Sequence, residues 1–97
     1  MQTACEIDGT PVTTANVRDM LVAAMAKPGG LRCSLTGRPV ALEEVTLDHI
    51  MPASLGGPDT MENLQIVTAQ ANTAKGTLTQ DEFVSLCIDV ARHHGAI

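Results

Sequence analysis

Five polar side chains between residues 48 and 75 are of types that can act together on a phosphate ester. Asp48 and His49 are adjacent, Asn63 follows His49 after 14 residues, Asn72 follows 9 residues later, and Lys75 comes 3 after that. Carboxylate and amide oxygens are hard ligands that suit Mg²⁺. An imidazole can take a proton from an attacking water near neutral pH, and a lysine ammonium can hold a phosphate as a point charge. This set predicts phosphodiester hydrolysis with one divalent cation.

These side chains can meet only if a strand, a loop and a short helix bring them together. EVTLDHI alternates the apolar Val45 and Leu47 with polar neighbours, as a strand does, and NLQIVT predicts a second strand or an extended arm. AQANTAK predicts a short helix that ends at Gly76. Asn72 and Lys75 would share one face of that helix, because residues three apart are neighbours on a helix surface.

The adjacent Asp48 and His49 pose a geometric problem, because neighbouring residues on a regular strand point to opposite faces. We therefore expect either a bulge here or the end of the strand. Pro52 cannot continue a β-ladder, and Gly56 and Gly57 are free to adopt positive φ, so the sequence favours such a distortion.

Two longer helices are predicted to flank this core. Thr13 and Thr14 can cap a helix over about residues 14–27, which Pro28 would end. Thr79 and Glu82 form a capping-box pattern ahead of a C-terminal helix. The predicted apolar stripes are Val17, Leu21, Ala24 and Met25 on the first helix, and Phe83, Leu86, Cys87, Val90 and Ala91 on the last. The fold class expected is α+β, in one small domain spanning residues 1–97.

Composition narrows the range of functions. The chain has 97 residues, enough for a single modest core, and no apolar run approaches the length of a membrane span. The N-terminus lacks the pattern of a signal peptide, so we expect a cytoplasmic protein without membrane contact. With one Phe and no Tyr or Trp, aromatic platforms for single-stranded bases are lacking. The net charge of −5 opposes generic affinity for nucleic acids.

The central segment nevertheless resembles the HNH endonuclease family. The resemblance rests on DHI-x-P-x-S-x-GG from residue 48, on NL from residue 63 and on N-x-x-KG from residue 72, and it covers about residues 31–84. The combination at these separations is far more specific than any one part. It implies a ββα-metal core, in which a two-stranded antiparallel hairpin and a short helix hold one divalent cation, Mg²⁺ or Mn²⁺.

Carried over residue by residue, the resemblance implies a role for each matching position. His49 would be the general base, Asp48 and Asn72 the metal ligands, and Asn63 the residue that fixes the loop and orients the base. For Asn63, structural support and direct chemistry both stay open. Lys75 is expected to bind phosphate, although a lysine also suits a helix C-terminus.

Arg38 is a second candidate for contact with the phosphate backbone, although a lone arginine near a turn is common on any surface.

Zinc-bearing relatives carry two C-x-x-C pairs, whereas here Cys33 is followed by Thr36, and Thr68 and Ala71 stand where the second pair would be. We therefore expect no structural zinc, and we expect the flanking helices to supply the packing instead. The three cysteines are expected to be small buried hydrophobic residues.

The function predicted is a metal-dependent endonuclease acting on double-stranded DNA, from a bacterium or a phage. The alternative is a catalytically inactive DNA-binding or protein-interaction module on the same scaffold. The acidic net charge favours this alternative. A dimer or a larger host complex is left open, since one active site cuts one strand at a time.

Overall fold

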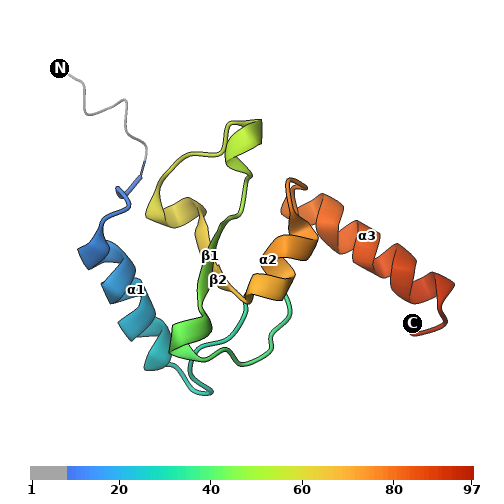
Figure 1. The fold of residues 1–97 in the computed structure, drawn as a ribbon, viewed down its shortest axis with the longest axis horizontal. Helices are drawn as coiled ribbons and strands as arrows, with labels where there is room; N and C mark the ends of the chain where they lie inside the picture. The colour runs from blue at the N-terminus through green and yellow to red at the C-terminus, as the bar shows by residue number, and fades with distance from the viewer. Residues whose placement is uncertain (1–8) are drawn as a thin grey trace.

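A computed structural model describes residues 9–97 of the chain, and Cys5 lies outside them. The described part is a small α+β domain with a two-stranded antiparallel sheet, as predicted (Figure 1). Its helices and strands are α1 (Thr14–Met25), β1 (Thr46–His49), β2 (Leu64–Val67), α2 (Ala69–Lys75) and α3 (Gln80–His93). Within residues 9–97, no helix is both long and apolar enough to cross a membrane.

Strands β1 and β2 form a regular hairpin. The register pairs Thr46 with Val67, and it continues without interruption until His49 pairs with Leu64. A bulge at Asp48 and His49 is therefore absent, and the other expectation is confirmed, because His49 is the last residue of β1. Asp48 and His49 consequently belong to opposite faces of the hairpin.

Helix α1 begins where the Thr13 side chain accepts a hydrogen bond from the main-chain N–H of Asn16. It ends at Met25, two residues before the predicted end. Its inner side chains pack on one face of the hairpin against a buried cluster. That cluster contains Leu31, Val40 and Ile66, with Met20, Leu21, Ala24, Val45 and Leu47 packed against it.

A second, smaller cluster includes two of the positions at which a zinc site was considered, Cys33 and Ala71. Cys33, Val67 and Ala71 are buried together, with Leu35 packed against them. The sulfur of Cys33 accepts a hydrogen bond of 3.4 Å from the main-chain N–H of Thr68. Apolar contacts therefore join α2 to the hairpin at this place.

Helix α3 does not pack as predicted. Its capping box is present. The Thr79 hydroxyl accepts a hydrogen bond from the main-chain N–H of Glu82, and the Glu82 carboxylate accepts one from the main-chain N–H of Thr79. None of its residues is buried, however, and Leu86, Cys87 and Val90 on the predicted inner stripe are exposed. Figure 1 shows α3 projecting from the rest of the domain. The expectation that α3 supplies core packing is wrong, as is the expectation of a buried Cys87.

Candidate active site

Asp48 lies on the face of β1 that α2 covers. Its carboxylate is 8% exposed, and Oδ2 accepts a hydrogen bond of 2.9 Å from Nε2 of Gln65. Gln65 is its cross-strand partner in the hairpin. Oδ2 also lies 3.2 Å from Nζ of Lys75. Among the described residues, no hydrogen bond is made to the other carboxylate oxygen, Oδ1, and no fully buried polar side-chain atom lacks a partner. Oδ1 is therefore the carboxylate oxygen that no donor within residues 9–97 occupies.

Lys75 is the last residue of α2, and its side chain is completely buried. Its ammonium also donates a hydrogen bond of 3.0 Å to the main-chain carbonyl of His49. Gly76 takes a positive φ of 56° and lets the chain turn away after the lysine. The ammonium therefore joins the side chain of Asp48 to the main chain of the next residue, and it is not presented to a phosphate in solution.

Asn72 is half-buried on α2, one turn before Lys75. Because residues three apart share a helix face, Asn72 lies on the face whose lysine reaches Asp48. The helix that carries Asn72 therefore lies on the side of the hairpin to which Asp48 points.

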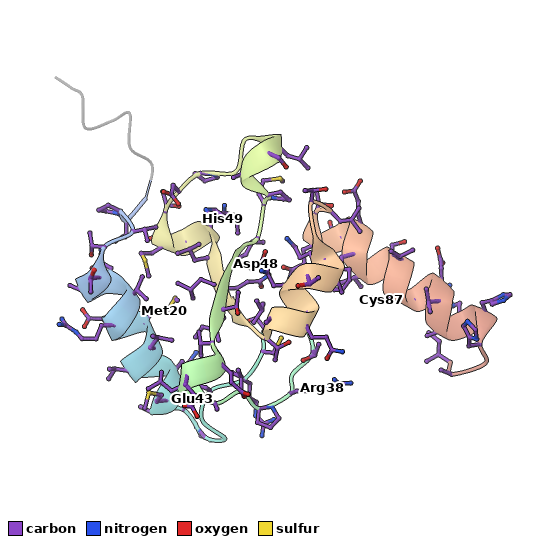
Figure 2. The ribbon with its side chains drawn as sticks, viewed as in Figure 1. Met20, Arg38, Glu43, Asp48, His49 and Cys87 are labelled. Carbon is purple, nitrogen blue, oxygen red and sulfur yellow. The ribbon has the colours of Figure 1, made fainter. Side chains whose placement is uncertain are left out.

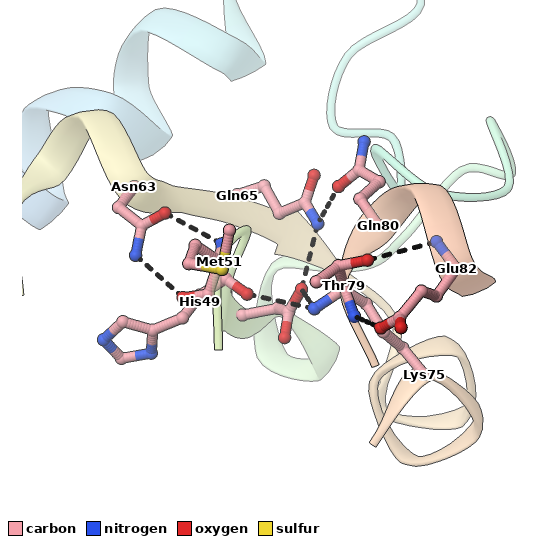
Figure 3. A network of polar contacts seen from close by, with 9 residues as sticks. His49, Met51, Asn63, Gln65, Lys75, Thr79, Gln80 and Glu82 are labelled. Carbon is pink, nitrogen blue, oxygen red and sulfur yellow. Dashed lines mark hydrogen bonds and ion pairs between the residues drawn. The ribbon is translucent and has the colours of Figure 1, made fainter. Parts of the chain in front are cut away.

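His49 points to the opposite side. Figure 3 shows its ring and the Lys75 side chain on opposite sides of β1. Nε2 lies 3.0 Å from Oδ1 of Asp59, an exposed residue of the loop that follows β1. When Nε2 carries the proton of this contact, Nδ1 is the nitrogen with a free lone pair, and it is the atom that can accept a proton.

Asn63 anchors the loop that follows His49. Its side-chain oxygen accepts a hydrogen bond of 2.9 Å from the main-chain N–H of Met51. Its amide nitrogen donates to the carbonyls of Met51 at 3.1 Å and Pro58 at 2.9 Å. All of these contacts are with the main chain, so the geometry favours the supporting role of Asn63 over direct chemistry.

Arg38 is not brought to the site. It is exposed in the turn beside the isolated bridge between Arg32 and Pro39. Figure 2 shows it well separated from both Asp48 and His49. A phosphate contact from Arg38 would therefore lie away from the reacting centre.

Three further residues at the site were not anticipated from the sequence: Gln65, Gln80 and Asp59. Gln65 donates to Asp48, and it also donates to Oε1 of Gln80 at 2.9 Å. The one available signal for Gln65 is that it is a polar residue in an otherwise apolar strand. This signal points to a contact with Asp48 only once the register that pairs the two residues is known. Nothing in the spacing marked Asp59.

The donor set suits a cation that keeps most of its water. Among residues 9–97, no group of three or more His, Cys, Asp and Glu side chains could hold a metal ion. One carboxylate oxygen of Asp48 and the amide oxygen of Asn72 are nevertheless hard donors, and Mg²⁺ is commonly bound through only one or two protein groups with several waters. The residues present fit a hydrated Mg²⁺ or Mn²⁺ and do not fit a four-ligand zinc site.

The family model for HNH endonuclease matches residues 31–78, which contain the hairpin, α2 and all the residues of this site except Gln80. This segment is similar to the HNH endonuclease family. Among curated proteins, none matches the chain. The HNH match makes nuclease activity the general expectation, and HNH enzymes generally use a divalent metal.

Proposed function

We propose that this chain is a metal-dependent endonuclease that hydrolyses DNA phosphodiester bonds with one divalent cation. Asp48 and Asn72 would hold Mg²⁺ or Mn²⁺, and His49 would act as the general base. The observation that carries the proposal is the arrangement of the Asp48 carboxylate. Gln65 and Lys75 both contact Oδ2, while Oδ1 accepts no hydrogen bond within residues 9–97, on the face of the hairpin covered by the helix of Asn72.

The opposite orientations of Asp48 and His49 define where the substrate must bind. Because His49 ends β1, a phosphate seated over the end of the strand can approach both faces of the hairpin. The imidazole removes a proton from a water molecule, the water oxygen bonds to phosphorus, and the bond between phosphorus and one ester oxygen breaks. The leaving oxygen then takes a proton from solvent. A bound cation would polarise the phosphate and stabilise that leaving oxygen.

A plasmid-nicking assay with Mg²⁺ or Mn²⁺ tests the assignment. His49→Ala should lower the cleavage rate by about 10²–10⁴-fold, the usual contribution of a general base, while leaving the metal-induced rise in Tm intact. Asp48→Ala and Asn72→Ala should lose both activity and that rise. His94→Ala is the matched control, because His94 is exposed at the end of α3.

Nicking by His49→Ala and Asn72→Ala at the wild-type rate would show that the site is wrongly assigned. If the wild-type protein bound DNA but showed neither cleavage nor a metal-linked rise in Tm, the inactive-module alternative would hold. An RNA substrate of the same sequence checks the preference for DNA. Arg38→Ala should raise KM without lowering kcat, since Arg38 lies apart from the reacting centre.

A further inference from the structure

A continuous chain of polar contacts runs from the start of α3 to the main chain of β1. Gln80, the first residue of α3, accepts from Gln65, Gln65 donates to Asp48, and Asp48 meets Lys75, whose ammonium donates to the carbonyl of His49 (Figure 3). The distances between the contacting atoms along this chain lie between 2.9 and 3.2 Å. Three of these contacts are hydrogen bonds, which orient their partners, and the contact between Asp48 and Lys75 is an ion pair.

All the strong contacts of Asp48 fall on one oxygen. Oδ2 receives both the amide of Gln65 and the ammonium of Lys75, whereas Oδ1 has no hydrogen bond within residues 9–97. The carboxylate is almost completely buried, so little freedom of rotation is left to it. A carboxylate held in this way offers one particular oxygen to a ligand.

The orientation of the Gln65 amide is itself specified. Both hydrogens of Nε2 are used, one by Asp48 and one by Oε1 of Gln80. A flipped amide would place its oxygen against two acceptor oxygens, which is unfavourable. Because the Asp48 carboxylate can only accept, it selects the orientation in which Gln65 donates, and Gln80 supports that orientation by accepting the second hydrogen.

We propose that Gln65 and Lys75 are positioning residues that hold Asp48 so that Oδ1 alone is offered to the cation, and that Gln80 fixes Gln65 in this task. The proposal rests on the function proposed above, since it concerns the same metal site. It also gives α3 a role: a helix with no buried residue is linked to the active centre through its first side chain.

The first experiment measures Mn²⁺ binding to the full chain by titration calorimetry, without DNA. Gln65→Met keeps the length of the side chain and removes both donors. Loss of a group that orients a metal ligand typically weakens metal binding by about 10–100-fold, and we expect a loss in this range. Gln70→Met is the matched control, because Gln70 is exposed on α2, and it should bind Mn²⁺ like the wild type.

A pair of variants at Gln80 separates positioning from simple structural support. Gln80→Met removes the acceptor and should weaken Mn²⁺ binding, by less than Gln65→Met does. Gln80→Glu keeps an acceptor oxygen and should restore the affinity. A merely structural role in starting α3 would not distinguish these two variants in metal affinity. Far-UV circular dichroism confirms that each variant is folded.

The outcomes distinguish this inference from the proposed function. Wild-type affinity in Gln65→Met, or equal defects in Gln80→Met and Gln80→Glu, would overturn the positioning role while leaving a nuclease that binds metal and cuts DNA. If the wild-type chain bound no Mn²⁺, both proposals would fail together. A loss confined to Gln65→Met and Gln80→Met supports the inference.

Discussion

Replacing Lys75 with methionine tests the interior ion pair directly. Methionine fills a similar volume but removes the charge, so Asp48 would lose its cation and the carbonyl of His49 would lose a donor. Removing one partner of a buried pair costs about 3–5 kcal/mol, because the other charge is left uncompensated. Asp48 would keep its bond to Gln65 and slight contact with solvent, so we expect a loss of about 3 kcal/mol in the free energy of unfolding.

The assay is urea unfolding followed by far-UV circular dichroism, since the chain has no Trp or Tyr to serve as a fluorescent probe. Lys27→Met is the control, because Lys27 is exposed after the end of α1, and its change should stay within about 0.5 kcal/mol. The variant with both Asp48→Asn and Lys75→Met removes both charges and should recover about 1 kcal/mol or more relative to Lys75→Met alone.

Two results would refute this reasoning. If Lys75→Met lost no more stability than Lys27→Met, the ammonium would not be held in the interior. If the double variant were no more stable than Lys75→Met, the loss would come from packing and not from the uncompensated charge of Asp48. Because the double variant keeps neither charge, it remains informative even where the single variant is largely unfolded.

Three further predictions concern the loops around the site. Gly57→Ala should destabilise the fold, because a Cβ there would lie 1.9 Å from a main-chain oxygen of the same loop, and a lowered urea midpoint checks this. Hydrogen bonds from the main-chain N–H and hydroxyl of Thr10 lower the pKa of Glu62 below its ordinary value of 4.5. This contact stabilises the fold above pH 4.5 and is lost as the pH falls through the lowered pKa, so Glu62→Gln should lower the urea midpoint at pH 7, and the difference from the wild type should shrink as the pH falls below 4.5. Asp59→Ala should lower kcat for plasmid nicking while leaving Mn²⁺ affinity unchanged, because Asp59 contacts His49 and belongs to the loop on the other side of the strand.

Much of the fold could be predicted because its signals are local. Caps, glycine stops and alternation each depend on a few neighbouring residues, and they place the two strands and α2 close to where the structure has them. The opposite directions of Asp48 and His49 follow from strand periodicity alone. The continuous register then shows that Asp48 and His49 lie at the end of the strand without a bulge between them.

The partners of the side chains could not be predicted, because they depend on how separate elements meet. A lysine before a glycine suits a helix end equally well when it is exposed, so the sequence could not reveal that Lys75 is buried. The apolar stripe of α3 predicts an inner face, but it does not specify a surface against which that face packs. In the described residues, α3 instead reaches the site through Gln80.

The two faces of β1 divide the proposed chemistry between two sets of supporting residues. On one face, Gln65 and Lys75 fix the carboxylate of Asp48 from β2 and α2. On the other face, the loop anchored by Asn63 carries Asp59, which contacts the imidazole of His49. The Lys75 ammonium connects the two faces, because it contacts Asp48, the proposed metal ligand, and also donates to the main-chain carbonyl of His49, the proposed base. An apolar residue at position 75 could fill the same space, but it could not contact both the carboxylate of Asp48 and the main-chain carbonyl of His49. The buried ammonium therefore orients both groups, although its removal from water is costly.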